Sequence, residues 1–357
     1  MGRCAATLWV SASNDAEHCS RPFRRHTVHR PVSGTIYSGG EQFSLPATGC
    51  GLSVGNFDGV HLGHREIIRR LRELAGGRGL PAVAVTFDPH PAAVLRPDRM
   101  PPPLTTVQRR AELLLGLGLD AVVVLDTTAD LLGLSPAEFY ERVLKNCLRG
   151  AAFVEGEDFR FGAERLGDTE QLRTWAVRDG LAFAAVSPVV AGTAAVSSSR
   201  VRQLLSSGEV TAAAELLGAA YAVSGTVEHG EHRGATIGFP TANLGGVATL
   251  LPAEGVYAGL ATTTAGSRHA AAIHVGKNLT FSAARPTVEV HLIDFSGDLY
   301  GQPLRVAFGR RLRDTCRFAS VEELTRQLRR DVAAAAVVEV ADAAWPPPRV
   351  TTTFLRG

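Results

Sequence analysis

From about residue 52 onward, short apolar runs alternate with segments that repeat apolar residues at helical spacing. An apolar strand at 52–54 leads through a glycine-rich stretch into an amphipathic segment at 64–75, which ends at two glycines. This repeated strand–helix–strand order predicts a parallel sheet with helices on its faces. The further elements predicted for this region are strands at 81–87, 121–125, near 152–154 and near 181–186, and helices around 107–117 and 135–148.

The pattern changes after Tyr221, beyond two short predicted helices at 201–210 and 211–217. Glycines then separate short stretches of alternating apolar and polar residues. These predict a small antiparallel β barrel or sandwich, closed by an amphipathic helix at 321–331. The alternating stretches lie at 223–227, 255–260, 270–275, 287–293 and 304–308. We therefore expect two domains, 46–217 and 218–345, with a poorly ordered N-terminal extension at 1–45 and a tail at 346–357.

Composition narrows the class of protein without identifying it. A length of 357 residues, 45% of them hydrophobic, allows each of two domains to bury a core. The net charge of +2 argues against a protein that binds nucleic acid by bulk electrostatic attraction. The longest apolar run, 181–196, is interrupted by Pro188 and Gly192 and is too short to span a membrane.

The five cysteines are scattered and show no C-x-x-C spacing. This usage argues against a structural zinc site and favours a reducing compartment. We therefore expect a cytoplasmic protein whose partners are small molecules rather than nucleic acid or membrane. The sequence leaves its oligomeric state open.

The glycine-rich stretch G-N-F-D-G-V-H-L-G-H lies between the first strand and the first helix, where α/β folds bind ligands. Gly55, Gly59 and Gly63 allow close approach of the backbone, and the N-terminus of a helix favours anions. His61 and His64 add ring donors for phosphate oxygens. A phosphate site is the favoured interpretation. A helix start with unrelated histidines stays open, and a zinc site is weaker because zinc usually needs further protein ligands.

This stretch resembles the signature of HxGH-type nucleotidyltransferases. In detail it resembles the N-terminal half of the prokaryotic bifunctional riboflavin kinase/FMN adenylyltransferases, also called FAD synthetases. Four further matches follow in chain order over about residues 46–217: T-F-D-P-H-P at 86–91, L-T-T at 104–106, G-E-D-F-R-F-G at 156–162 and V-S-S-S-R-V-R at 196–202. The resemblance implies a Rossmann-like α/β nucleotidyltransferase domain that adenylylates FMN.

The resemblance also implies roles for individual residues of this domain. A phosphate monoester is mostly dianionic at neutral pH, so transfer needs alignment and charge neutralisation more than a base. The serines could equally be the N-cap of a helix, and Phe159 could be an ordinary core residue. The implied catalytic residues are His61, His64 and Arg202; the implied ATP contacts are Gly55, Phe57, Asp58, Gly59, Gly63, Ser197, Ser198, Ser199 and Arg200; the implied flavin contacts are Pro89, His90, Asp158 and Phe159.

In the second half, H-G-E-H-R-G-A-T-I-G-F-P-T-A-N-L at 229–244 resembles the glycine-rich loop and Pro-Thr-Ala-Asn element of riboflavin kinases. Taken alone, the segment could also be a hairpin loop before a strand. The resemblance implies Mg²⁺ binding by Thr241 and Asn243. It implies ATP contacts by Gly230, Arg233, Gly234, Gly238 and Pro240, and flavin contacts by Tyr257 and Arg313.

The segment T-V-E-V-H-L-I-D-F at 287–295 alternates in polarity, which puts Glu289 on the face opposite Val288 and Val290. The 5′-hydroxyl of riboflavin is a poor nucleophile and benefits from a base. Glu289 matches the general base of the kinase family, although the pattern alone also fits a harmless surface carboxylate.

Two positions of the second half depart from the family pattern. Leu279 stands where the family has proline, and Thr315 stands where it has an acidic residue. Both departures bear on flavin affinity in the kinase domain. We expect an enzyme that uses ATP and Mg²⁺ to convert riboflavin to FMN and FMN to FAD. A single-activity nucleotidyltransferase is one alternative. A flavin-binding regulator with an inactive site is another, although His61, His64 and Glu289 are all present.

Overall fold

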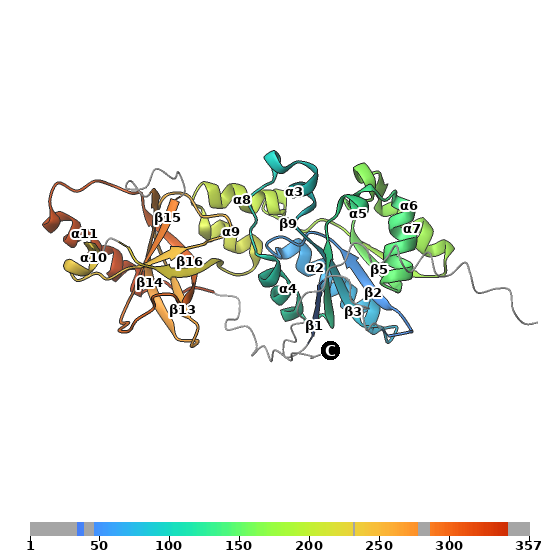
Figure 1. Cartoon of the computed structure of the whole chain (residues 1–357), viewed down its shortest axis with the longest axis horizontal. Coiled ribbons are helices and arrows are strands. Elements are labelled where there is room, and N and C mark those ends of the chain that lie inside the picture. The colour runs from blue at the N-terminus through green and yellow to red at the C-terminus, as the bar shows by residue number, and fades with distance from the viewer. Residues whose placement is uncertain (1–33, 39–45, 231–232, 278–285, 342–357) are drawn as a thin grey trace, which may run out of the picture. The chain divides into compact units, whose positions relative to one another are not determined.

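The structure is a computed structural model that describes residues 34–38, 46–230, 233–277 and 286–341 (Figure 1). Its contacts divide the chain into two compact units. The first contains the described residues up to 101 together with 107–189, and the second contains 102–106 together with 190–341. Residues 190–217, which we expected in the first domain, are therefore grouped by their contacts with the second unit.

The first unit is built on a six-stranded parallel sheet in the order β1-β4-β3-β2-β5-β8. The order reverses beside β2, because β3 and β4 lie on one side of it and β5 and β8 on the other. In open α/β sheets, ligands bind at the carboxyl ends of the strands at such a reversal. The strands are β1 (Thr35–Ser38), β2 (Cys50–Val54), β3 (Ala82–Asp88), β4 (Ala121–Asp126), β5 (Gly150–Gly156) and β8 (Ala182–Val186).

Helices cover both faces of this sheet, as the sequence predicted (Figure 1). One buried cluster joins the sheet to Ile68 and Leu114, and the other joins it to Tyr140 and Leu172. The helices are α2 (Leu62–Gly76), α3 (Pro91–Leu95), α4 (Val107–Gly116), α5 (Ala129–Gly133), α6 (Pro136–Glu138), a π-helix (Phe139–Cys147) and α7 (Thr169–Arg178). A short hairpin, β6 (Arg160–Phe161) and β7 (Gly167–Asp168), and 3-10 turns at Pro97–Arg99 and Ala163–Arg165 complete the unit.

Two features of this unit differ from the sequence expectations. Within the supposedly poorly ordered extension, Thr35–Ser38 forms an edge strand that pairs with β4, Thr35 lying opposite Ala121. Four residues are too short a run for the polarity pattern to reveal. The predicted helix at 135–148 winds mostly as a π-helix, in which the Leu148 N–H donates to the Val143 carbonyl five residues back. Residues 1–33 and 39–45 lie outside the described residues.

The second unit contains a closed antiparallel barrel in the order β11-β12-β15-β14-β13-β16. Closure decides between the barrel and the sandwich that the sequence left open. The strands are β11 (Tyr221–Glu228), β12 (Ala242–Gly245), β13 (Gly255–Thr263), β14 (Arg268–Lys277), β15 (Pro286–Leu292) and β16 (Pro303–Arg313). The other elements are β9 (Val190–Ala191), β10 (Ala194–Ala195), α8 (Ser198–Ser206), α9 (Val210–Leu217), α10 (Arg233–Thr236) and α11 (Val321–Ala336).

Helix α11 packs against β13 and β14 on the outside of the barrel. It runs five residues further than the amphipathic pattern predicted, since the alanines that follow Asp331 are strong helix formers. The parallel-sheet unit, the barrel and the closing helix together confirm the fold class expected from the sequence.

Candidate active sites

The glycine-rich loop of the first unit connects β2 to α2 and presents two stacked histidines. His61 is the N-cap of α2, and its Nδ1 accepts a hydrogen bond from the His64 backbone N–H at 3.4 Å. The His61 and His64 rings stack with centroids 3.6 Å apart. The Phe57 ring meets His64 edge-on at 5.3 Å. The sequence motif therefore folds into a preformed pair of imidazoles at a helix N-terminus.

His64 is held in its neutral form. Burial, followed by the nearby charges of His61 and Arg110, lowers the pKa of His64 well below its usual value. Its Nδ1 is buried and has no hydrogen-bond partner among the described residues. A bound polyphosphate would supply both a partner and negative charge, which would raise this pKa again. The site thus offers a neutral His64 ring before an anion arrives.

Beneath the loop lies a buried ion pair. Asp58 and Arg110 are each 3% exposed, and Arg110 Nη2 lies 3.7 Å from Asp58 Oδ1. Arg110 Nη1 also donates to the Thr86 hydroxyl at 3.2 Å. Asp58 and Phe57, both expected to contact ATP, are therefore buried as supports of the loop. The resemblance of L-T-T at 104–106 extends to an arginine at 109 or 110, but local sequence could not indicate that Arg110 pairs with Asp58.

A cavity of about 470 Å³ opens beside this loop. Its wall includes the expected residues Gly55, His90, Asp158 and Phe159. The Phe159 ring stacks on Phe161 with centroids 5.4 Å apart. Aromatic walls of this kind suit a flat, apolar ring system. Three lining arginines were not expected from the sequence, because nothing in the motif marks them: Arg96, Arg160 and Arg165.

Pro89 does not line this cavity, although the sequence placed it at the flavin. Its carbonyl accepts a hydrogen bond from the Thr127 hydroxyl at 2.5 Å. Pro89 therefore ties the end of β3 to the segment after β4, and its neighbour His90 reaches the cavity instead.

The serine–arginine segment begins α8 in the second unit. Ser197 is the N-cap, with its hydroxyl accepting from the Arg200 N–H at 3.2 Å, and Ser198 and Ser199 form the first turn. Arg200 Nη1 donates to the carbonyls of Ala191 and Ala194, at 2.9 Å each. Arg202 Nε donates to the Pro102 carbonyl at 2.8 Å. The N-cap interpretation is thus realised, and the role of this segment toward ATP stays a prediction.

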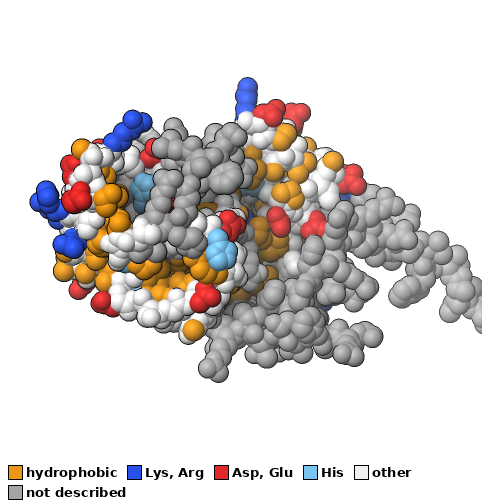
Figure 2. Space-filling view, turned by 60° about the vertical axis from the view of Figure 1, so that its left-hand side comes forward, with side chains coloured by type: hydrophobic (Ala, Val, Ile, Leu, Met, Phe, Trp, Pro, Cys, Tyr) orange, Lys and Arg blue, Asp and Glu red, His pale blue; other side chains and the backbone are white. Residues whose placement is uncertain are grey.

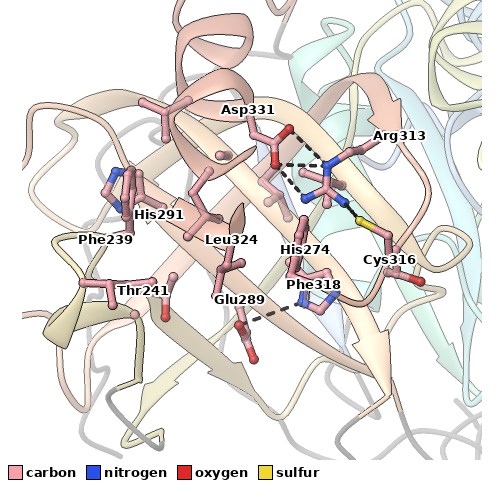
Figure 3. A pocket seen from close by; sticks show the side chains of 18 residues that line it. Phe239, Thr241, His274, Glu289, His291, Arg313, Cys316, Phe318, Leu324 and Asp331 are labelled. Atoms are coloured by element: carbon pink, nitrogen blue, oxygen red, sulfur yellow. Dashed lines mark hydrogen bonds and ion pairs between the residues drawn. The ribbon is translucent and has the colours of Figure 1, made fainter. Parts of the chain in front are cut away.

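A second cavity, of about 510 Å³, lies between the outer face of the barrel and α11 (Figure 3). Thr241, Glu289 and Arg313, all expected from the sequence, line it together with several unexpected side chains. Hydrophobic side chains gather around a hollow on the barrel face that Figure 2 turns forward. Thr315, which the sequence linked to flavin affinity, lines it too, as does Phe318. The unexpected lining includes His274, His291, Cys316 and Leu324.

Strand register brings the expected kinase residues together. Glu289 of β15 lies directly opposite Asn243 of β12 on one side and His274 of β14 on the other. The His274 Nδ1 lies 3.8 Å from Glu289 Oε2, and both side chains are about two-fifths exposed. A carboxylate therefore stands at the cavity rim, beside an amide oxygen that could help hold a metal ion.

In the second unit, the glycines before β12 pack directly on the Pro-Thr-Ala-Asn segment at 240–243. A Cβ at Gly230 would collide with the Asn243 amide, and one at Gly234 would collide with the Phe239 carbonyl. Only glycine allows these close approaches. Gly238 has a positive φ of 86° at the turn before Pro240. The side chain of Arg233 and the whole of Leu279 lie outside the described residues.

A buried ion pair joins α11 to the barrel beside the cavity. Arg313 Nη2 donates to Asp331 Oδ2 at 2.7 Å, and its Nε lies 3.1 Å from both oxygens. Asp331 is 4% exposed and also accepts from Gln327. The Arg313 guanidinium lies over the Phe318 ring at 5.8 Å. This pair fixes one wall of the cavity.

Tyr257 is not brought to this cavity, contrary to expectation. It is fully buried, and its hydroxyl donates to the Ala253 carbonyl at 2.5 Å. Its neighbour Val256 lines the cavity, so alternation along β13 turns Tyr257 toward the barrel interior, where it packs on Phe308.

No group of three or more His, Cys, Asp or Glu side chains among the described residues is placed to hold a metal ion. None of the helices in the described part of the chain is long and apolar enough to cross a membrane.

Comparison with known proteins matches each unit to an enzyme family. The FAD synthetase family model matches residues 45–200, and the riboflavin kinase model matches residues 217–338. A solved structure described as a macrolide-efflux protein from Streptococcus pneumoniae shares 32% identity and a TM-score of 0.76 over 84% of this chain and 97% of that one. Efflux is part of that protein's description and is not attributed to this chain.

Curated relatives match across both halves of the chain. The bifunctional riboflavin kinase/FMN adenylyltransferase of Escherichia coli strain K12 is 35% identical over 286 residues, which is 80% of this chain and 91% of that protein. The protein of the same name from Pseudomonas fluorescens is 37% identical over 288 residues, covering 80% of this chain and 92% of its own length. The chain therefore belongs to the family of bifunctional riboflavin kinase/FMN adenylyltransferases.

Proposed function

We propose that the barrel cavity is where riboflavin is phosphorylated, with Glu289 as the general base. The observation that carries this proposal is the row formed by Asn243 and Glu289 on neighbouring strands beside a largely apolar cavity. The cavity has the size and lining expected for a flat ring system. Its rim holds the one carboxylate among the expected site residues of the barrel.

The chemistry of this step follows from the groups at the rim. Glu289 takes the proton of the riboflavin 5′-hydroxyl as that oxygen forms a bond to the γ-phosphorus of ATP. The bond from that phosphorus to the bridging oxygen breaks, and ADP leaves. The Glu289 carboxylate is half-exposed, so its proton can then pass to solvent.

Thr241 and Asn243 would hold Mg²⁺ at this site. Their side-chain oxygens are the hard ligands that Mg²⁺ prefers, and the described residues form no dedicated cage of acidic ligands. This set fits an ion that is held by a few protein oxygens together with nucleotide phosphates. When bound, the ion would neutralise the charge of the phosphates.

We further propose that the first unit joins FMN to ATP at its glycine-rich loop. The FMN phosphate needs no base, because it is already mostly dianionic. It attacks the α-phosphorus of ATP, and pyrophosphate leaves. His61, His64 and the N-terminus of α2 donate hydrogen bonds to the phosphates. The aromatic cavity beside Phe159 would hold the flavin ring, with the arginines of its wall near the FMN phosphate.

Both proposed steps consume ATP, which favours the cytoplasm as the place of action.

Product analysis tests the assignment of the two reactions to this protein. The purified protein is incubated with riboflavin, ATP and Mg²⁺, and the flavins are separated by chromatography. FMN should form and then FAD. Absence of both products would overturn the proposal.

Single substitutions test the two sites separately. His64→Ala should stop the reaction at FMN, because removing a transition-state donor lowers the rate of adenylyl transfer about 100-fold or more. Glu289→Gln keeps the shape of the side chain but removes the base. It should lower FMN formation about 100-fold or more and still convert supplied FMN to FAD. Loss of both activities in either variant would contradict the assignment of one step to each site.

A further inference from the structure

The Pro240 carbonyl lies just before β12 and is contacted by a side chain of the neighbouring strand β15. Strand β12 pairs with β15 at Ala242 opposite Val290 and at Asn243 opposite Glu289. The pairing of β12 with β15 begins only at Ala242, and proline has no N–H of its own to donate, so Pro240 lies outside the ladder. Nδ1 of His291 lies 2.8 Å from the Pro240 carbonyl oxygen. The imidazole thus supplies a donor to a carbonyl that precedes the paired residues.

Chemistry fixes the direction of this hydrogen bond. A carbonyl oxygen can only accept, so His291 Nδ1 must carry a proton. Both the neutral Nδ1–H tautomer and the imidazolium can donate from this atom, so the contact does not depend on the charge of the ring. The edge of the Phe239 ring system supports the imidazole, with centroids 5.6 Å apart and planes at 63°.

This contact controls the peptide that leads into Thr241. The Pro240 carbonyl carbon is bonded to the Thr241 nitrogen, so fixing the carbonyl oxygen also fixes the plane from which Thr241 departs. On the other side, the Phe239 N–H donates to the Gly234 carbonyl at 2.8 Å. Figure 3 shows His291 beside Phe239, with Thr241 on the same side of the cavity.

We propose that His291 is a positioning residue for the kinase step. Its Nδ1–H holds the Pro240–Thr241 peptide and thereby aims the Thr241 and Asn243 oxygens at Mg²⁺ and the ATP phosphates. The inference rests on the proposed function of the barrel and adds to it a residue that acts through Thr241 rather than on the substrate. Loss of such an outer partner commonly weakens metal affinity or activity by about 10–100-fold.

The test compares two substitutions of His291 in the full-length protein. His291→Leu removes the donor but keeps apolar bulk against Phe239. His291→Gln keeps an N–H donor. His269→Leu is the matched control, because His269 lies on neighbouring β14, is partly buried and meets Phe295 edge-on at 5.1 Å, yet does not line the cavity.

Binding of ADP, measured by titration calorimetry with Mg²⁺ and again with a chelator, is the main readout. His291→Leu should weaken the Mg²⁺-dependent part of ADP binding about 10-fold or more. It should raise KM for ATP by a larger factor than KM for riboflavin, whose proposed cavity His291 also lines, and leave FAD formation from supplied FMN unchanged. His291→Gln should recover most of the loss, and His269→Leu should behave as wild type.

Three results would overturn the role of His291. They are unchanged ADP binding in His291→Leu, an equal loss with and without Mg²⁺, or a glutamine variant no better than the leucine variant. If His291→Leu does not fold, ¹⁵N NMR of the wild-type histidines still decides, since the neutral His291 ring must carry its proton on Nδ1 and an Nε2–H tautomer would contradict the hydrogen bond. Failure of the wild-type protein itself to make FMN would instead refute the proposed function.

Discussion

Glu155 is a carboxyl group buried at the point where the sheet order of the first unit reverses. The β2–β5 ladder ends at Leu52 opposite Phe153, and Glu155 Oε1 then accepts the Val54 N–H at 2.7 Å. The residue is 1% exposed, and burial raises its pKa well above the usual value. A carboxylic acid therefore replaces a backbone partner just before the glycine-rich loop.

Replacing this carboxyl by an amide should stabilise the protein at neutral and alkaline pH. The pKa of Glu155 in the folded protein lies above its unfolded value of about 4.3. The protonated acid therefore contributes its full share to the free energy of unfolding below about pH 4.3, and this contribution is lost as the pH rises toward the folded pKa. Glu155→Gln keeps the acceptor for the Val54 N–H and does not titrate, so its thermal midpoint should exceed that of wild type by more at pH 8 than at pH 5.

Thermal denaturation at the two pH values checks this expectation. Between the unfolded and the folded pKa of Glu155, each pH unit changes the free energy of unfolding of the wild type by about 1.4 kcal/mol. Glu157→Gln is the control, because Glu157 is exposed two residues further along. A difference for Glu155→Gln that stays constant between pH 5 and pH 8 would show that the buried carboxyl does not change its proton occupancy on folding.

At the scale of elements, the kinase cavity depends on how α11 is attached to the end of β16. Arg313 and Asp331 form the bidentate contact described above, with side chains 22% and 5% exposed. Breaking a buried pair leaves one charge without compensation, whereas replacing both partners by apolar residues is often tolerated. The attachment of α11 should therefore be sensitive to single changes and less sensitive to the matched double change.

Asp331→Ala should destabilise the barrel by up to about 3 kcal/mol, because it leaves the Arg313 guanidinium, whose side chain is only 22% exposed, without its carboxylate. It should also raise KM for riboflavin, since Phe318 and Leu324 line the cavity on this wall. The double variant Arg313→Met/Asp331→Leu should recover much of the stability but not the riboflavin affinity. Denaturant unfolding with and without riboflavin measures both effects, and an unchanged unfolding midpoint for Asp331→Ala would contradict this account.

Polarity patterns predicted most elements but not which strand faces meet a cavity. Alternation correctly put Glu289 opposite the apolar row of β15, because that strand pairs regularly with both neighbours. It did not indicate that Tyr257 faces the interior, and the pairing of β13 with β16 shifts register between Val256 and Tyr257. The supporting contacts of Arg110, His291 and Asp331 join residues far apart in the chain, so local patterns could not reveal them.

At the scale of the whole molecule, the chain carries two units with separate cores and separate cavities. The family and the order of the two activities along the chain, expected from the sequence motifs, are confirmed by the two family models. The expected FMN intermediate is the product of one unit and the substrate of the other. Since the lining of each cavity comes from one unit alone, damage to one cavity should leave the other working.

Mixing two singly inactivated proteins should therefore restore the complete reaction. His64→Ala supplies an intact barrel cavity, and Glu289→Gln supplies an intact glycine-rich loop in the first unit. FMN released by His64→Ala can therefore be adenylylated by Glu289→Gln. Neither variant alone should make more than traces of FAD from riboflavin, whereas an equimolar mixture should make FAD after a lag in which FMN accumulates. Diluting the mixture should lengthen the lag, because FMN must then reach the second site through solution. A mixture that makes no FAD, although Glu289→Gln alone adenylylates supplied FMN, with the FMN remaining bound to His64→Ala rather than free in solution, would show that the intermediate is not released between the two steps.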